Sequence, residues 1–96
     1  MPGQTFITVT VSSAGTRVRV TSTPTPVRRI YFQAGDANTQ SVYLGGSDVS
    51  STVHGRDIHS YEDWLVEYQD GRGDLSDWYV DADTNNNKLL ITGILP

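Results

Sequence analysis

The chain has 96 residues, no cysteine and a formal net charge of −4, which describes one small domain without disulfides or thiolate metal ligands. The charge is uneven, because residues 1–35 carry four arginines and no acid, whereas residues 36–96 carry eleven acids and three basic residues. No apolar run approaches the roughly 20 residues of a membrane span, and the N-terminus lacks the features of a signal peptide. We therefore expect a soluble protein with no membrane partner, and a core small enough to gain from oligomerisation or from docking on a larger body.

Alternation of apolar and polar residues predicts strands in the first third of the chain. Residues 5–11 alternate with β-branched residues on both faces, and residues 17–23 alternate again after a turn at residues 12–15, so we expect these two strands to form a hairpin. Pro24 and Pro26 then predict a stiff corner, since proline cannot donate to a strand ladder.

A third strand is expected at residues 27–34, with Ile30, Phe32 and Ala34 on one face. The next stretch, residues 41–51, predicts a short strand that ends at Gly45-Gly46, the strongest turn signal in the chain because glycine enters positive φ without steric cost. Residues 48–53 read equally as a second short strand or as an irregular loop.

Three segments complete the pattern. Residues 61–68 have some helical spacing, but we favour a strand that places Trp64, Val66 and Tyr68 on one face. Residues 77–83 predict another strand, followed by a turn at residues 84–87. Residues 88–95 predict a final strand that is apolar on both faces, which indicates cover on both sides, the second cover being a neighbouring subunit. The fold class is therefore all-β, a small antiparallel β-sandwich or barrel of about seven to eight short strands.

The sequence contains two candidate chemical sites, one catalytic and one for a metal ion, and ordinary turn structure explains the residues of each. The two histidines, His54 and His59, lie in a turn-rich region, and no serine occupies a nucleophile elbow, so we expect no catalytic site. Residues 81–87 place oxygen ligands at alternate positions, as calcium loops do, but the sixth and twelfth positions, Asn86 and Thr92, do not fit, and a hairpin turn explains the residues better. We expect neither a metal nor a cofactor.

Two further patterns concern binding. Residues 72–74 match the Arg-Gly-Asp tripeptide that integrins bind, but they also make an ordinary glycine-rich turn. The seven tyrosine and tryptophan residues could form a stacking platform for a sugar or for bases, but some of them share faces with core aliphatics, and a core role for most of them explains the pattern better. Four arginines without interleaved aromatic residues do not indicate nucleic-acid binding.

Residues 38–51, with the pattern N-x-x-S-V-Y-x-G-x-S-x-V-S, and residues 75–82, with L-x-x-x-Y-V, resemble small all-β virion structural proteins of tailed bacteriophages. The chain departs from that pattern in its acidic segment at residues 61–74, where a Pro-Gly turn would usually stand. The resemblance implies a non-enzymatic capsid cement or decoration protein that bridges capsomers on the virion surface. Its implied partners are itself, as a homo-oligomer such as a trimer, and the major capsid protein.

Two alternatives remain at this stage: a neck, tail or baseplate protein of the same fold, and a carbohydrate-binding β-sandwich module. For assembly we expect contacts at the N-terminal strand with its arginines and at the C-terminal strand. The expected contact residues are Arg17, Arg19, Arg28, Arg29, Leu90, Ile91, Ile94 and Leu95. Removal of residues 90–96 is expected to break the assembly before it abolishes β structure.

Overall fold

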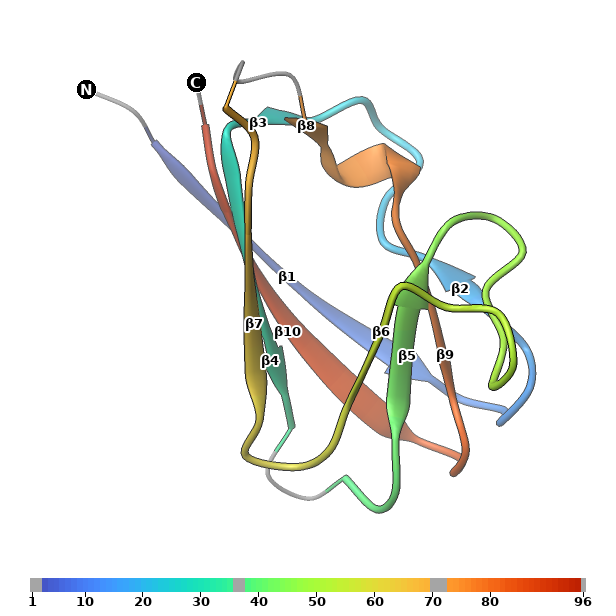
Figure 1. Cartoon of the computed structure of the whole chain (residues 1–96). Coiled ribbons are helices and arrows are strands. Elements are labelled where there is room, and N and C mark those ends of the chain that lie inside the picture. Colours follow the sequence, from blue (N-terminus) through green and yellow to red (C-terminus); the bar gives the residue numbers. More distant parts are fainter. Residues whose placement is uncertain (1–2, 36–37, 70–72, 96) are drawn as a thin grey trace.

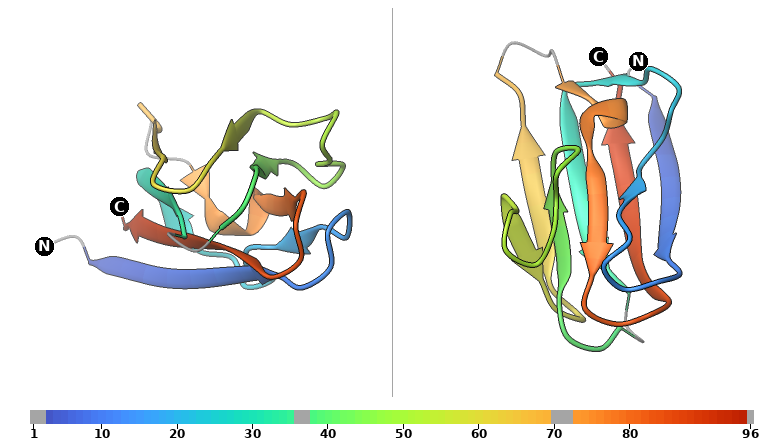
Figure 2. Two further views of the ribbon diagram at one scale, coloured as in Figure 1. Left: turned by 90° about the horizontal axis from the view of Figure 1, so that it is seen from below. Right: turned by 90° about the vertical axis from the view of Figure 1, so that its right-hand side faces the viewer.

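The computed structural model describes residues 3–35, 38–69 and 73–95 as two four-stranded antiparallel sheets packed face to face (Figures 1 and 2). Sheet A contains, in spatial order, β1 (Gln4–Val11), β10 (Asn87–Ile94), β4 (Arg29–Ala34) and β7 (Asp63–Glu67). Sheet B contains β2 (Val18–Arg19), β9 (Tyr79–Ala82), β5 (Val42–Gly45) and β6 (Arg56–Ile58). The two-stranded pair β3 (Pro26–Val27) and β8 (Gly73–Asp74) and the 3-10 turn η1 (Leu75–Asp77) lie at one end of the sandwich (Figure 1). The all-β class is confirmed, and the sheets stay open rather than closing into a barrel.

The core lies between the sheets and is built by alternate residues of both. Ile30 and Phe32 of sheet A and Leu44 and Ile58 of sheet B are fully buried there. The Phe32 ring packs against that of Trp78, with ring centres 5.0 Å apart. These are the positions that period-two alternation assigns to one face of a strand, so the inward faces expected from the sequence are largely correct.

The expected N-terminal hairpin is wrong. β1 pairs with β10 along its whole length, whereas only two residues of the segment 17–23 form a strand, β2, which pairs with β9 in the other sheet. The connection crosses the sandwich through Gly15, the one glycine in the described residues with positive φ (84°). Its N–H donates to the Asp81 carboxylate at 3.0 Å. Alternation correctly gave the buried face of residues 5–11 but carries no information about the partner strand.

The Gly45-Gly46 stretch forms a strand end followed by a loop. Gly45 remains within β5, opposite Tyr79, and the turn begins at Gly46, whose carbonyl accepts from the Val49 N–H at 3.0 Å. Neither glycine has positive φ, which corrects the reason given for this turn. Gly45 has little space beside it, because an added Cβ would lie 3.2 Å from the Val49 side chain. The chain then returns as β6, so the irregular-loop alternative holds for residues 48–53.

The segments expected at residues 61–68 and 88–95 are strands, β7 and β10. β10 is a central strand that pairs with both β1 and β4. Its removal would take the middle out of sheet A, so the expectation that β structure survives loss of residues 90–96 does not fit this topology. The described residues contain no helix long and apolar enough to span a membrane.

Candidate functional site

Alternate residues of sheet A point away from the core and form its outer face. The pairing register arranges them in rows across all four strands. The central row contains Phe6, Thr92, Tyr31 and Leu65. The flanking rows contain Thr8, Leu90, Gln33 and Asp63 on one side, and Gln4, Ile94, Arg29 and Glu67 on the other. Rows lie about 7 Å apart along each strand, so side chains of neighbouring rows are within reach of one another.

Apolar side chains concentrate on this face. Phe6 is 71% exposed, Leu65 45% and Leu90 44%, and they belong to three different strands of the same sheet. The half-buried Tyr31 lies in the central row between Phe6 and Leu65, and the half-buried Ile94 lies in the flanking row on the side away from Leu90. We call Phe6, Tyr31, Leu65, Leu90 and Ile94 the outer patch. A cluster of exposed apolar residues across one face of a sheet is typical of a surface that contacts another molecule.

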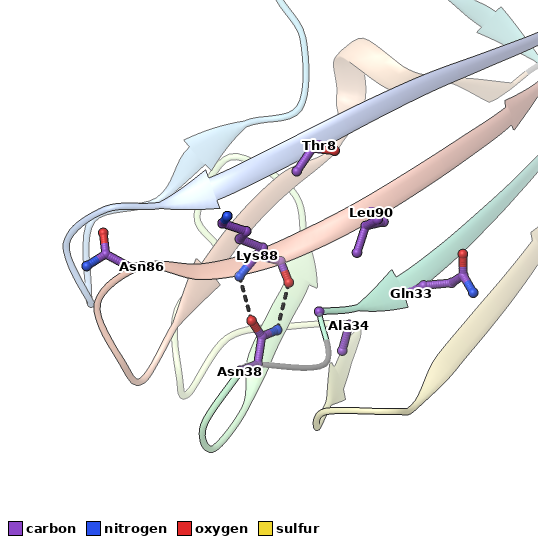
Figure 3. Close-up of a pocket in the computed structure, with 8 residues that line it drawn as sticks. Thr8, Gln33, Ala34, Asn38, Asn86, Lys88 and Leu90 are labelled. Carbon is purple, nitrogen blue, oxygen red and sulfur yellow. Dashed lines mark hydrogen bonds between the residues drawn. The ribbon is translucent and has the colours of Figure 1, made fainter.

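A shallow depression of about 570 Å³ extends the outer face toward the β4–β5 connection (Figure 3). Thr8, Gln33, Lys88 and Leu90 line it from the strands, and Asn38 lines it from the connection. The Asn38 side chain donates to the Lys88 carbonyl and accepts from the Lys88 N–H, both at 2.7 Å. The Asn38 amide thereby replaces a neighbouring strand beside β10, which holds this end of the face in a fixed shape.

Three of the charged side chains of the outer face, Arg29, Asp63 and Glu67, lie on β4 and β7. Arg29 pairs with Glu67 at 3.6 Å between partly exposed side chains, a contact worth little in water. The Tyr31 hydroxyl donates to the Asp63 carboxylate, and this hydrogen bond raises the pKa of Tyr31. β1 itself contains no charged residue, but the exposed Lys88 of β10 lies opposite Thr10 on the same face.

The four arginines expected to act together are dispersed. Arg19 lies on the outer face of sheet B, where its Nε donates to the Ser76 carbonyl at 2.8 Å. Arg29 lies on the outer face of sheet A, and Arg17 and Arg28 are exposed in connections. The basic N-terminal third of the sequence therefore does not become one basic surface, because Arg19 and Arg29 belong to different sheets.

The four C-terminal residues of the expected contact set also divide. Leu90 and Ile94 belong to the outer patch. Ile91 is 2% exposed and faces the core, and Leu95 is half-buried against it. Ile91 and Leu95 therefore stabilise the sandwich, and a surface role falls to Leu90 and Ile94.

The outer face of sheet B is polar and internally bonded. The Ser41 hydroxyl lies 3.1 Å from His59 Nε2 and 3.4 Å from Asp57 Oδ2, and His59 Nε2 lies 3.7 Å from the same Asp57 oxygen. A Ser-His-Asp triad uses opposite nitrogens of the imidazole ring for serine and aspartate. Here both partners meet Nε2, and Ser41 is 6% exposed, so the three residues form a hydrogen-bonded cluster without the geometry of a relay.

Tyr43 and Asp83 form the second polar contact of this face. The Tyr43 hydroxyl donates to Asp83 Oδ2 at 2.7 Å. This hydrogen bond, with burial second, raises the pKa of Tyr43 to about 12. The Tyr43 ring also packs on His54, with ring centres 4.7 Å apart.

The oxygen-rich segment 81–87 is a crossing between the sheets, since β9 and β10 belong to different sheets; the expected hairpin there is corrected accordingly. Its side-chain oxygens accept hydrogen bonds from separate parts of the chain. The Asp81 carboxylate accepts from the N–H groups of Gly15 and Ala82. The Asn85 side-chain oxygen accepts from the Ala14 N–H, and the Asn87 side-chain oxygen accepts from the Thr39 N–H. Among the described residues, no group of three or more acidic, histidine or cysteine side chains is placed to hold a metal ion.

Of the Arg-Gly-Asp tripeptide, Arg72 lies outside the described residues. The Asp74 carboxylate accepts from the Thr25 N–H and from both the N–H and the hydroxyl of Ser76, at 2.8–2.9 Å. These bonds, the one from the Thr25 N–H first, lower the pKa of Asp74. Asp74 thus caps η1 and ties it to the Pro24–Pro26 corner.

Aromatic residues meet at a second, smaller crevice of about 360 Å³. Tyr68, Trp78 and Asp77 line it together with the bare backbone of three glycines, Gly45, Gly46 and Gly55. Trp78 Nε1 donates to the Tyr68 hydroxyl at 3.1 Å. This crevice, rather than an exposed platform, is where aromatic rings reach the surface together.

Comparison with known proteins does not add a residue assignment. No model of a known protein family matches the chain, and a search of curated proteins finds no match.

Sequence reasoning missed Phe6 and Leu65 as surface residues. Both are large apolar residues at positions that alternate with the inward-facing residues of their own strands, which are odd-numbered in β1 and even-numbered, though only half-buried, in β7. A large apolar residue at an outward-facing position of a strand is therefore the sequence signal that identifies Phe6 and Leu65 as surface residues.

Proposed function

We propose that the chain is a non-enzymatic structural protein of a bacteriophage particle, a capsid cement or decoration protein that docks on the major capsid protein through the outer face of sheet A. The observation that carries the docking is the outer patch, which joins exposed apolar side chains of β1, β7 and β10 with the half-buried Tyr31 of β4 on one face of the sheet. The virion setting is supported by the sequence resemblance of residues 38–51 and 75–82. A neck, tail or baseplate position would use the same face.

The size of this face is consistent with the way a cement protein works. Two strands of eight residues, one of six and one of five, spaced about 4.8 Å apart with a rise of about 3.3 Å per residue, give a projected area of roughly 400–450 Å². A standard protein interface buries about 800 Å² on each partner, so one copy would bind with modest affinity. Many copies on a repeating shell multiply that affinity, and each contact must break before the shell ruptures.

Virion labelling tests the proposed location. Antibodies raised against the chain should label the heads of purified phage particles that encode it. Label confined to the neck, tail or baseplate would replace the capsid proposal with its nearest alternative. Particles that carry no label would overturn the structural role.

Rebinding tests the proposed face. The chain should rebind to heads from which it has been removed, and Leu65→Lys should weaken this rebinding at least tenfold, because a charge would be buried on an apolar contact. Val53→Lys is the matched control, since Val53 is equally exposed (48%) but lies in the loop beside sheet B. Equal rebinding by both variants would show that the outer face of sheet A is not the docking surface.

A glycan-binding module is the second candidate, and the crevice at Tyr68 and Trp78 favours it. Two aromatic rings beside a carboxylate, Asp77, provide an apolar wall and a hydrogen-bond acceptor for a sugar ring. Retention on a glycan array that Asp77→Ala abolishes would support this candidate, and absence of retention by the intact chain would dismiss it.

A further inference from the structure

The two sheets together have four edge strands, and β1 differs from the other three. β1 is eight residues long, pairs without a break, and contains no charge, proline or glycine. Of the others, β7 carries Asp63 and Glu67, and β2 and β6 have two and three residues with arginines in them. Proteins protect edge strands by shortness, charge, proline or bulges, because an open edge offers unpaired backbone groups to another chain. Only β1 lacks every one of these protections.

The open edge can be assigned residue by residue. The Val11 carbonyl accepts from the Asn86 N–H at 2.7 Å, and the Gly3 carbonyl accepts from the Leu95 N–H at 2.9 Å. Because backbone groups point to alternate edges along a strand, the odd-numbered residues face β10. The N–H and C=O groups of the even-numbered residues therefore face away from it; these residues are Gln4, Phe6, Thr8 and Thr10. No described strand lies beyond β1 in sheet A (Figure 2, right).

We propose that a second copy of this chain occupies this edge: two β1 strands pair antiparallel about a twofold axis and join the two A sheets into one sheet of eight strands. An uncharged strand is complementary to itself, and a twofold axis closes the assembly after one contact. In the fully overlapping register, Gln4 lies opposite Thr10 of the second copy and Phe6 opposite its Thr8. Each such pair exchanges two backbone hydrogen bonds, about eight in total.

The side chains favour the same arrangement. The four even-numbered residues also direct their side chains to the outer face, so pairing brings the two Phe6 rings diagonally across the axis, within reach of each other. The dimer would thereby shield an aromatic side chain that is 71% exposed in the single chain. It would also double the outer face to roughly 800–900 Å², close to the usual area of one side of a standard interface. The pairing itself does not depend on which larger partner the face contacts.

A proline at the open edge gives the first test. Thr8→Pro removes an N–H that points away from β10, so the sandwich should still form, while two of the hydrogen bonds of the dimer are lost. We expect the dimer dissociation constant of the full chain, measured by sedimentation equilibrium, to rise about 10- to 100-fold. Thr8→Val is the matched control, because it keeps the N–H and the strand propensity, and it should dimerise as the unmodified chain does. Leu65→Lys should dimerise normally too, which separates this contact from the docking face.

Hydrogen exchange of the unmodified chain gives a second test that does not require a variant to fold. The amides of Thr5, Ile7 and Val9 should be protected at every protein concentration, because they pair with β10. The amides of Phe6, Thr8 and Thr10 should become at least tenfold more protected as the concentration rises through the dimer dissociation constant. A chain that stays monomeric at millimolar concentration would overturn the proposal. So would a dimer in which these even-numbered amides exchange freely.

Discussion

Sheet A and sheet B bury alternate residues in one shared core, yet their outer faces differ in kind. On sheet B, the outward polar groups bond within the chain: Tyr43 donates to Asp83, and Asp81 accepts from two backbone N–H groups. On sheet A, the outward residues include Phe6 and Leu90, which are mostly or partly exposed. Polar groups that are already bonded gain little from a partner, whereas exposed apolar area gains by being covered. The outer face of sheet B therefore has little to gain from a partner, whereas the outer face of sheet A would be stabilised by one.

The largest expected effect comes from substituting adjacent residues on the two sides of β10. Ile91→Asp would put a carboxylate into the core, where the side chain is 2% exposed. The cost of burying that charge is comparable with the whole stability of a small domain, about 5–10 kcal/mol, so we expect an unfolded chain. Leu90→Asp faces outward and should keep the fold, with a change below about 1 kcal/mol. Circular dichroism and urea unfolding of the pair measure this, and two folded variants would contradict the assigned faces.

The next largest effect concerns the hydrogen bonds on the outer face of sheet B and whether they stabilise the fold. Asp81 is 3% exposed, and its Oδ1 accepts from the N–H groups of Gly15 and Ala82. Asp81→Ala would leave the buried Ala82 N–H without this acceptor, whereas the exposed Gly15 N–H would keep its contact with the Ala82 carbonyl at 3.3 Å. We therefore expect a loss of about 1–3 kcal/mol in the free energy of unfolding. The exposed Asp48 provides the control, since Asp48→Ala should change stability by less than about 0.5 kcal/mol. Equal losses in the two variants would argue against a structural role for Asp81.

The tyrosine of the same face should respond to pH. The pKa of Tyr43 is raised from 10.0 to about 12, first by its hydrogen bond to Asp83. The neutral hydroxyl is thus favoured in the folded chain, so its stabilisation is complete below pH 10 and is lost as the pH rises toward 12. We expect this loss to be about 1 kcal/mol after solvent screening. An absorbance titration should place one tyrosine near pH 12, and Asp83→Asn should return it toward 10; an unchanged titration in that variant would contradict the assignment.

The sequence predicted the faces of this fold better than its pairings. Alternation correctly located β4, β7 and β10 and most of the residues that they bury, because burial on one side imposes period two on any strand. It could not show that β1 pairs with the last strand of the chain rather than with the segment 17–23. Partner choice depends on contacts between segments far apart in sequence, and two strands of equal periodicity satisfy the same local pattern.

The candidate site was predicted in part, because the sequence indicates the faces of single strands but not which distant strands lie side by side. The apolar residues on both sides of β10 indicated a covered outer face, and Leu90 and Ile94 do lie there. Ile91 was grouped with Leu90 and Ile94 because β10 is apolar on both faces. In such a strand, residue type alone does not separate the residues that face the core from those that face outward. Phe6 and Leu65 joined the face only through register, since they come from strands that share no local sequence with β10. A surface assembled from four strands becomes visible only when their order is known.

The smallest expected effect on stability concerns Phe6. Phe6→Ser removes an exposed side chain from the outer patch, so the free energy of unfolding should change by less than about 0.5 kcal/mol. Binding of a hydrophobic dye should nevertheless fall, because Phe6 lies in the same surface as Leu90, Ile94 and Leu65. Val53→Ser provides the comparison, since Val53 is exposed in a loop on the other side of the sandwich. Fluorescence titration at low protein concentration should show a greater loss for Phe6→Ser, and an equal or smaller loss would mean that the outer patch does not act as one apolar surface.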